Sequence, residues 1–342
     1  MAKQRHHYIS NFLCKHFSAD NISFYRHDNK DGKIIPISTK DGYVQKHLYR
    51  LRKKDGTYDD RMEDIFSDYY EKPASIAIAS LIERLKRGTV ETLLTTKEFL
   101  AILNFCILSH IRTPNKLNEI YLSQVRLILT ITYMELKLHN IPLDIDFSVN
   151  LNREMIFLET IKSIPAITKK LFNLSIHVFY HRSDQHYFVL PDQPVALYPN
   201  DDREFGSKNL QIYFPVSSSI LIRFERGPHT DTLTELRADQ IDEFNQMACS
   251  RHYRYIACEN KEYLENFVRN TKLTSEPVQS DESLEQDKKD IIEQVIHTLD
   301  NTASTSTILV NSRHGVQLAK TLPFTKSGIK KFWKQLLKKI WK

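Results

Sequence analysis

The sequence QIYFPVSSSILIRF, residues 211–224, decides the fold because it contains two strand-like runs, 211–214 and 220–224, separated by turn-forming residues. The segment before it has the same character. Apolar side chains alternate over residues 174–180, and further strand-like runs occupy 186–190 and 195–198. Because alternation with a period of two is typical of strands, residues 174–224 predict a central sheet. We expect a helix at about 238–250 and a strand at 253–258 to close that sheet.

The residues that precede this sheet show helical periodicity instead. Apolar positions at helical spacing run from about 60 to 140, and one helix should end just before Gly88, a good C-cap residue. Two longer helices are predicted at about 96–112 and 117–139. They are separated at Thr113-Pro114, because the residue before a proline disfavours the helical region. A further helix is expected at 152–171, interrupted near Pro165.

The first forty residues predict a small hairpin. Runs at 22–26 and 33–38 flank the dipeptide Asp31-Gly32, which is a hairpin signal. Strands, then helices, then a sheet describe a segregated α+β architecture. We therefore assign the chain to the α+β class, with an N-terminal hairpin, a central helical segment and a C-terminal, mainly antiparallel sheet.

The last part of the chain has a different composition. Residues 274–290 hold six acids, two lysines and almost no large apolar residue, which is typical of a linker. A short helix is expected at 291–299. The predicted organisation is a main domain over 1–270, an acidic linker over 271–290 and a C-terminal appendage over 291–342.

A basic amphipathic helix is predicted over 327–342. Its apolar stripe has the spacing of one helix face and consists of Ile329, Phe332, Trp333, Leu336, Leu337, Ile340 and Trp341. Seven lysines and no acid lie in residues 326–342, so this segment accounts for the net charge of +6. The stripe predicts a partner, which is an anionic membrane surface, the protein's own domain or a second copy of the chain. Nucleic acid is a further alternative.

Composition disfavours several classes of protein. No apolar run long enough for a secretory signal follows the N-terminus, and none approaches the roughly 18 residues of a membrane span. We expect a cytoplasmic protein, peripherally attached to a membrane if the C-terminal helix binds lipid. The four cysteines include no Cys-x-x-Cys pair, so we expect reduced thiols. Eight glycines and no Gly-rich phosphate loop disfavour a nucleotide-binding fold.

Five polar residues are candidates for a functional site. His6 and His7 carry imidazoles that can act as a general base or bind a metal near neutral pH. Asp192 lies between two prolines after an apolar run, where a loop can present a catalytic carboxylate. Arg112 ends an apolar helix and can hold a phosphate or a carboxylate through two hydrogen bonds. Glu71 is a carboxylate at the start of another helix.

Each candidate also has a purely structural interpretation. Histidines are often surface or hydrogen-bonded structural residues, and Asp192 can cap a turn through its own backbone. Arg112 can satisfy the last carbonyls of its helix, and Glu71 can favour a helix N-terminus. Spacing alone favours the structural interpretation of the histidines and of Asp192.

These fragments together resemble a mainly bacterial family of unknown function. Its members open with His-His-Tyr-Val-Pro-x-Phe, which corresponds here to residues 6–12. Later motifs appear in order: a glutamate at 71, Arg-Thr-Pro at 112–114, an Asp-x-Pro-Val turn at 192–195, a strand at 212–217, and a helix and strand at 244–256. The resemblance covers about residues 5–260. Ser10, Pro191 and Gln193 depart from the family pattern, whereas Asp192 keeps it.

The resemblance implies that His6 or His7, Glu71, Arg112 and Asp192 converge on one site, but it supplies no reaction. These residue types suffice for a hydrolase that acts on a phosphate-bearing substrate, such as nucleic acid or a nucleotide, in a bacterial defence or toxin setting. The alternative is a non-catalytic ligand-binding or sensor module, attached to a membrane or a protein partner through the C-terminal helix. The sequence leaves open whether the protein is an enzyme. It assigns no cofactor, although a divalent metal fits the same residue types.

Overall fold

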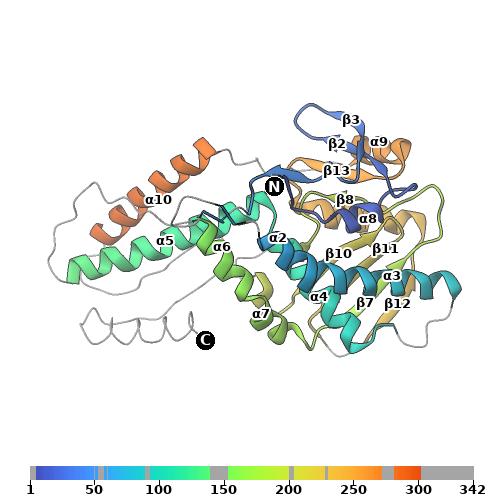
Figure 1. Ribbon diagram of the computed structural model, residues 1–342, viewed down its shortest axis with the longest axis horizontal. Coiled ribbons are helices and arrows are strands. Elements are labelled where there is room, and N and C mark those ends of the chain that lie inside the picture. The colour runs from blue at the N-terminus through green and yellow to red at the C-terminus, as the bar shows by residue number, and fades with distance from the viewer. Residues whose placement is uncertain are drawn as a thin grey trace. The chain divides into compact units, whose positions relative to one another are not determined.

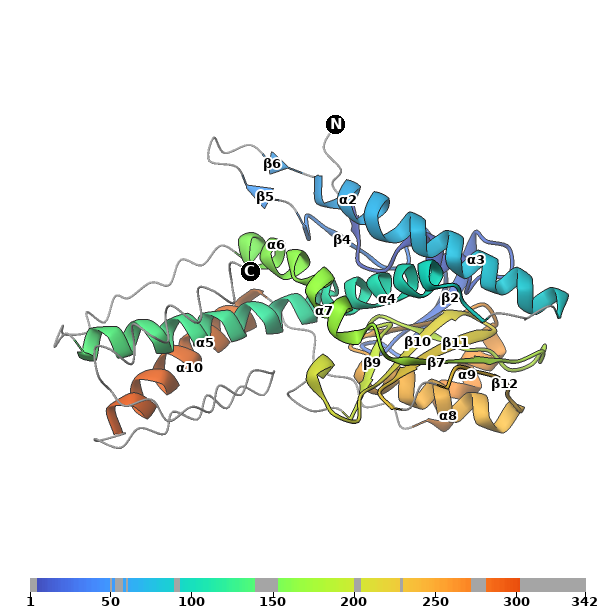
Figure 2. The same cartoon turned by 90° about the horizontal axis from the view of Figure 1, so that it is seen from below.

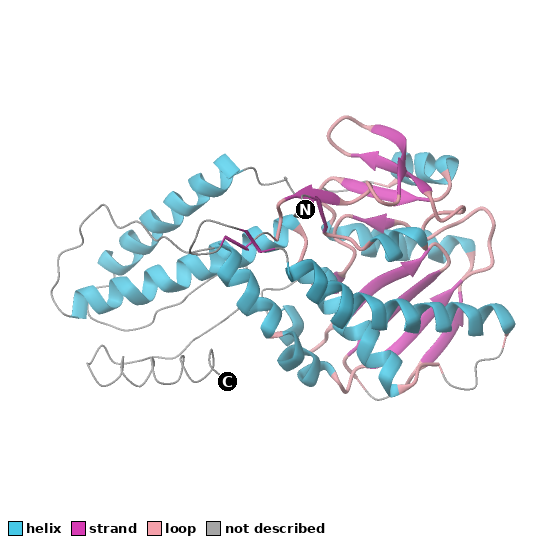
Figure 3. Cartoon of the chain, in the orientation of Figure 1, coloured by secondary structure: helices cyan, strands magenta, loops and turns pink. Residues whose placement is uncertain are grey.

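The computed structural model describes residues 5–49, 51–52, 58–59, 61–88, 93–138, 153–199, 204–227, 230–271 and 281–301. Helices and strands in these residues form an α+β protein, which confirms the predicted fold class (Figures 1 and 3). The chain divides into two compact units. The larger comprises residues 1–117, 157–200 and 204–278, and the smaller comprises 118–156, 201–203 and 279–342.

The larger unit contains the predicted central sheet. Its strands take the order β12-β7-β11-β10-β9, and they are β7 (Ser175–Tyr180), β9 (Ala196–Tyr198), β10 (Gln211–Ser217), β11 (Ile220–Glu225) and β12 (Thr232–Glu235). β10 and β11 form an antiparallel pair from the sequence 211–224, with Tyr213 opposite Arg223. Of the described pairs in this sheet, β12 with β7 is the parallel one. The sheet is therefore mainly antiparallel, as the sequence predicts.

Helices cover both faces of this sheet. α4 (Thr96–Ile111) packs on one face, where the ring centroids of Phe105 and Phe214 lie 5.8 Å apart. α8 (Ala238–Ala248) packs on the other, where those of Phe244 and Tyr213 lie 6.1 Å apart. Tyr213 and Phe214 are consecutive in β10, so their side chains point to opposite faces. Figure 2 shows α4 and α8 on opposite sides of the strands.

A second sheet contains the N-terminal hairpin. β2 (Ser23–Asp28) pairs with β3 (Lys33–Ser38), and Gly32 before β3 has φ +67°, which glycine adopts without strain. The sheet order is β3-β2-β13-β8, with β13 (Tyr255–Cys258) antiparallel to β2. The hairpin is therefore confirmed. The expectation that the strand at 253–258 closes the central sheet was wrong, because that strand pairs with the hairpin.

The strand expected at 186–190 is mostly irregular. Only its last residue belongs to β8 (Leu190–Pro191). The amide of Phe188 donates to the Ser218 carbonyl, and the amide of Val189 donates to the Asn245 side chain. These two amides therefore take partners from a turn and a helix, and the ladder with β13 starts only after them.

The helices that precede the central sheet follow the predicted pattern. α2 (Arg61–Ile65) continues through a π-helical turn, Phe66–Glu71, into α3 (Lys72–Arg87), which ends at Gly88 in the left-handed conformation. α4 begins with a capping box in which Thr95 and Glu98 exchange hydrogen bonds. The remaining helices of this part are α5 (Pro114–Leu138), α6 (Arg153–Lys162) and α7 (Ile164–Leu171). The breaks at Pro114 and near Pro165 lie where the sequence places them.

The smaller unit contains most of α5 together with α10 (Asp281–Asn301). Their contact buries a cluster of apolar residues at helical spacing: Tyr121, Val125, Leu129, Tyr133, Leu284, Ile291 and Val295. α10 begins ten residues before the helix expected at 291–299 and lies partly in the predicted acidic linker, 271–290, because Leu284 extends its buried stripe. The division at residues 270 and 290 stays a prediction, and the amphipathic segment 327–342 lies outside the described residues. No helix in the described part of the chain is long and apolar enough to cross a membrane.

Candidate functional site

Arg112 and Glu71 form a buried ion pair. Arg112 follows the last residue of α4, and its side chain is 1% exposed. Its Nη1 donates to Glu71 Oε1 at 2.7 Å, and Glu71 is the last residue of the π-helical turn. Burial alone would lower the pKa of Arg112, but the charge of Glu71 outweighs burial and raises it. The structure therefore brings two of the five candidates into direct contact.

The other edge of the Arg112 guanidinium is unused. Its Nε and Nη2 are buried and have no hydrogen-bond partner among the described residues. The guanidinium carbon lies 5.9 Å from the ring centroid of Phe66 and 5.7 Å from that of Phe105. Nε and Nη2 form the fork that can hold two oxygens of one carboxylate or phosphate. An unused fork on a buried cation is a candidate anion site.

His6 contacts a residue that bonds to Arg112. It lies in β1 (Arg5–His7), which pairs with β4 (Val44–Lys46), and its side chain is fully buried. Its ring stacks on Tyr49 with centroids 5.5 Å apart, and its Nδ1 accepts a hydrogen bond from the Tyr49 amide at 2.8 Å. The Tyr49 hydroxyl donates to the Arg112 carbonyl at 2.6 Å. His6 is therefore linked to Arg112 through Tyr49 and holds a structural position.

His7 is the candidate that can take up a proton. It is half-buried, and its Nε2 donates to the Lys40 carbonyl at 3.1 Å, because a carbonyl can only accept. The neutral ring then carries its lone pair on Nδ1. Burial lowers the pKa of His7, while the charge of Glu71 raises it and that of Arg112 lowers it. The charges of Glu71 and Arg112 therefore both act on His7, and its ring is a neutral base at pH 7.

Asp192 bonds to backbone amides rather than to the ion pair. Its buried carboxylate accepts three hydrogen bonds, from the amides of Tyr253, Arg254 and Tyr255 at 2.8, 2.7 and 2.9 Å. Burial raises the pKa of Asp192, and these three bonds oppose that shift. No described hydrogen bond joins Asp192 to Arg112. The structural interpretation of Asp192 fits these contacts, although the backbone that it caps is that of residues 253–255.

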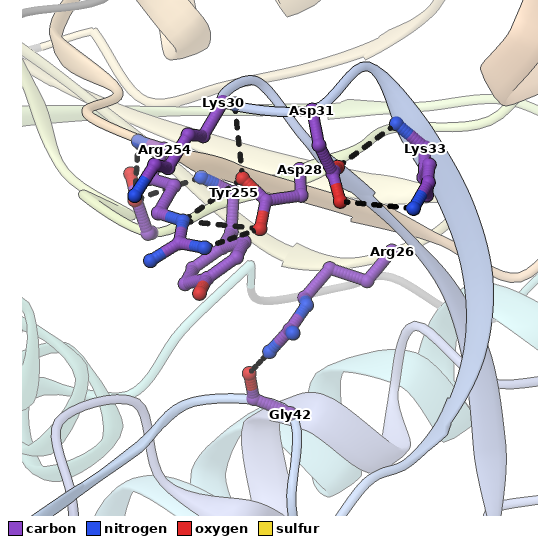
Figure 4. A network of polar contacts seen from close by, with 9 residues as sticks. Arg26, Asp28, Lys30, Asp31, Lys33, Gly42, Arg254 and Tyr255 are labelled. Carbon is purple, nitrogen blue, oxygen red and sulfur yellow. Dashed lines mark hydrogen bonds and ion pairs between the residues drawn. The ribbon is translucent and has the colours of Figure 1, made fainter.

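These three bonds fix the start of β13 beside β2. Figure 4 shows the polar contacts of Arg26, Asp28 and Arg254 at this place. Arg254 donates to both carboxylate oxygens of Asp28, from Nε at 2.8 Å and from Nη2 at 2.6 Å. Its guanidinium carbon lies 4.7 Å from the Tyr255 ring centroid, and that of Arg26 lies 3.9 Å from the same centroid. Arg26 also donates to the Gly42 carbonyl at 2.5 Å. Asp192 therefore positions an aromatic ring against which two arginines pack.

Gln193 joins the loop of Asp192 to the junction between α4 and α5. Thr113 donates its hydroxyl to Gln193 Oε1. The amide nitrogen of Gln193 lies 3.1 Å from His110 Nδ1 and 3.3 Å from the His110 carbonyl. The segments 112–114 and 192–195 therefore meet in the fold, although Arg112 and Asp192 bond to different partners.

Three charged or titratable residues near this junction were not predicted: His110, Lys116 and Glu204. Lys116 makes an ion pair with Glu204, and His110 Nε2 lies 3.9 Å from Glu204 Oε2. A histidine inside the apolar run of α4 was the available signal, whereas nothing in the sequence around Glu204 marks that residue. No group of three or more metal-ligating side chains occurs among the residues that the structure describes, so the divalent metal stays a prediction.

Comparisons with known proteins place the chain in one family. No curated protein and no solved structure matches it. A family model described as a protein of unknown function (DUF4238) matches residues 5–262. That span is three quarters of the chain and includes all five candidate residues. The chain therefore belongs to the DUF4238 family of proteins of unknown function.

Proposed function

We propose that this protein binds a phosphate-bearing ligand through Arg112, as a ligand-binding or sensor module. The observation that carries the proposal is the unused fork of Arg112, whose Nε and Nη2 are buried while Nη1 is held by Glu71. A guanidinium that is already fixed on one edge loses little freedom when a ligand binds the other. The buried aromatic surroundings also strengthen a charge-assisted hydrogen bond.

Glu71 and His7 are the residues of this group that solvent reaches. The Glu71 side chain is 23% exposed and His7 is half-buried, whereas Arg112 beneath them is nearly inaccessible. Glu71 keeps Nη1 while the phosphate binds Nε and Nη2, so the negative charge of Glu71 opposes that of the ligand and limits the affinity. In the ligand-free protein, Glu71 is the counterion that makes a buried guanidinium tolerable.

Hydrolysis of the bound ligand is the second candidate function, and the state of His7 favours it. A neutral imidazole with its lone pair on Nδ1 lies within the electrostatic reach of Glu71 and Arg112. In this role Arg112 holds the phosphate, His7 takes a proton from the attacking water, and the leaving oxygen takes its proton from solvent. We propose no catalytic role for Asp192 in this reaction, because its carboxylate accepts hydrogen bonds from three backbone amides.

Binding is tested by calorimetric titration of the full chain with inorganic phosphate, a mononucleotide and a short single-stranded oligonucleotide. We expect saturable binding of at least one probe, and an affinity about tenfold lower in Arg112→Lys, because lysine keeps the charge but lacks the fork. Arg84→Lys is the matched control, since Arg84 pairs with Glu98 at 2.8 Å in the same helical layer. Wild-type protein that binds none of the probes, or a folded Arg112→Lys protein that binds equally well, contradicts the proposal.

We also propose that the protein is cytoplasmic and is attached to an anionic membrane surface by residues 327–342. This proposal rests on the sequence alone. Lysines lie opposite an apolar stripe that contains two tryptophans, and such a helix lies in the plane of an anionic bilayer surface.

A further inference from the structure

A second group of buried charges lies where α5 begins. We call His110, Lys116, Glu204 and Arg251 the Glu204 cluster. Lys116, in the first turn of α5, pairs with Glu204, which opens a short 3-10 turn. His110, in the last turn of α4, places Nε2 3.9 Å from Glu204 Oε2. The positive charge of Arg251 lowers the pKa of His110, and Arg251 is included in the cluster for that reason.

A chain of hydrogen bonds fixes the proton of His110. Thr113 donates to Gln193 Oε1, which leaves the Gln193 amide nitrogen to donate to His110 Nδ1 at 3.1 Å. An Nδ1 that accepts a hydrogen bond carries the lone pair, so the proton of the neutral ring is on Nε2. Burial lowers the pKa of His110, although Glu204 opposes that shift. His110 is therefore a neutral donor with its N–H on the side of Glu204.

Two buried donors of the cluster are unused. His110 Nε2 and Arg251 Nε have no hydrogen-bond partner in the part of the chain that the structure describes, and their residues are 1% and 8% exposed. At 3.9 Å, Glu204 Oε2 is too far from His110 for a hydrogen bond. Buried N–H groups without acceptors cost free energy, so they indicate an acceptor that binds there. Together with the Lys116 ammonium, these donors have the chemistry of an oxyanion site.

The Glu204 carboxylate pairs with Lys116 in the ligand-free protein and so occupies the position proposed for the anion. Burial alone would raise its pKa, but His110 and the charge of Lys116 hold the pKa of Glu204 well below its usual range. Its backbone has φ +44°, a left-handed conformation that residues other than glycine rarely adopt. A strained residue persists only while its contacts hold it, so a competitor for Lys116 relieves the strain. Glu204 is therefore suited to exchange with a bound anion.

We propose that the Glu204 cluster is a binding site for a small tetrahedral oxyanion, such as inorganic phosphate. The anion displaces Glu204 from Lys116 and accepts a hydrogen bond from His110 Nε2, while the charge of Arg251 adds to the positive potential there. The site is distinct from the Arg112 fork, because Arg112 bonds to Glu71 and to no member of the cluster in the described contacts. Binding at this site makes the conformation of the turn Glu204–Gly206 depend on the phosphate concentration.

The ring signals of His110 report on this site directly. In full-length protein labelled with 15N-histidine, NMR should show one ring protonated on Nε2 that disappears in His110→Gln. Inorganic phosphate should shift the signals of this ring saturably, and should still do so in Arg112→Lys, which separates this site from the Arg112 fork. His110 signals that do not respond to tens of millimolar phosphate would overturn the proposal. Sulfate, in a parallel titration, shows whether the site selects phosphate or accepts any tetrahedral oxyanion.

The change in phosphate affinity when the charge of Glu204 is removed is a second test. Glu204→Gln removes the internal competitor, so the affinity for phosphate read from His110 should rise about tenfold, because one like charge at close range is lost. Lys116→Met should weaken binding by a similar factor. Glu98→Gln is the control, since Glu98 pairs with an arginine outside the cluster. Weaker or unchanged phosphate binding in a folded Glu204→Gln protein would contradict the claim that phosphate displaces Glu204. If this variant does not fold, the titration of wild-type His110 with phosphate tests the proposal instead.

Discussion

Thr113 donates its side-chain hydroxyl to Gln193, and this one hydrogen bond joins two loops that lie 80 residues apart in the sequence. Each partner is the neighbour of a buried charge, Arg112 on one side and Asp192 on the other. The two charges bond in different places, Arg112 to the Glu71 carboxylate and Asp192 to the backbone of residues 253–255. The junction therefore lies between two contacts with different roles. The contact of Asp192 anchors a sheet, whereas the contact of Arg112 leaves two guanidinium nitrogens for a ligand.

Asp192→Asn should destabilise the protein. Asparagine offers one acceptor oxygen where the carboxylate offers two, so at least one of the three buried amides of residues 253–255 loses its partner. An unsatisfied buried group costs about 1 to 3 kcal/mol, and urea denaturation should show a free energy of unfolding lower by that amount. Asp184→Asn, at an exposed carboxylate in the loop before β8, should be neutral. An Asp192→Asn protein with wild-type stability and no ligand binding would instead place Asp192 in the functional site.

Glu71→Gln should leave a buried guanidinium without a counterion. Removing one partner of a buried ion pair costs about 3 to 5 kcal/mol. Inorganic phosphate should then raise the Tm of Glu71→Gln more than that of the wild type at equal ionic strength, because the ligand supplies the missing negative charge. Asp68→Asn, which breaks an exposed pair with Lys72, is the control and should cost less than about 1 kcal/mol. A Tm of Glu71→Gln that phosphate does not raise beyond the wild-type increase counts against an anion at Arg112.

His7→Gln should slow hydrolysis of a bound probe by about 100-fold or more and leave its Kd unchanged. In the proposed reaction His7 takes a proton from water, whereas Arg112 binds the phosphate. Burial lowers the pKa of His7, so the basic form predominates at pH 7 and is lost only below the usual histidine range. The rate should therefore fall on the acid side at a pH below that of an exposed histidine. A pH–rate profile with His186→Gln as control measures this. If the wild type binds the probe tightly but does not hydrolyse it, the hydrolase function is contradicted and the sensor function remains.

Glu98→Gln should remove stability that depends on pH. Burial alone would raise the pKa of Glu98, but hydrogen bonds from Arg84 and Thr95 lower it to about 2. A carboxyl group with a depressed folded-state pKa stabilises the protein above its unfolded-state value, and that stability is lost as the pH falls toward 2. The contribution is about 2 to 3 kcal/mol at neutral pH. Urea titrations between pH 7 and acid should show a steeper loss for the wild type than for Glu98→Gln; equal slopes would refute the assignment.

Deletion of residues 327–342 should abolish binding to vesicles with anionic headgroups. The lysines of this segment are attracted to such headgroups, and added salt should weaken the interaction because it screens them. Co-sedimentation with anionic and with zwitterionic vesicles measures both effects. Equal vesicle binding by the deletion variant removes the membrane anchor, whereas loss of dimerisation or a lower Tm, without vesicle binding by the wild type, favours a protein partner.

Features that depend on a few neighbouring residues could be predicted from the sequence. The helix break at Thr113-Pro114, the end of α3 at Gly88 and the turn at Asp31-Gly32 all follow from local backbone restrictions. The partner of β13 could not be predicted in this way, because Tyr255 pairs with Asp28 from the other end of the domain. Periodicity indicates that a segment is a strand, but it does not identify the edge to which that strand adds.

The candidate site was predictable to a similar extent. Resemblance to a family identified His7, Glu71 and Arg112 as polar residues of interest, and the fold joins Glu71 and Arg112 in an ion pair whose charges act on His7. The contacts of Asp192 could not be predicted, because the amides that reach a carboxylate are selected by tertiary packing. The same reason explains why Glu204 was missed. Its partners come from the ends of two helices, and no local pattern surrounds it.

The π-helical turn Phe66–Glu71 acts as a phase shift in an otherwise regular helix. A π turn holds one residue more than the α-helical turn that it replaces, so deleting one residue, such as Ser67, would rotate the helix before it by about 100° relative to α3. Phe66, whose ring lies 5.2 Å from that of Tyr49, and Glu71, which holds Arg112, could not both keep their contacts after that rotation. A family member that lacks this single residue would keep the helix but lose the ion pair between Glu71 and Arg112. The length of this turn, more than the identity of its residues, would then distinguish chains that retain the Arg112 site from chains that have only the fold.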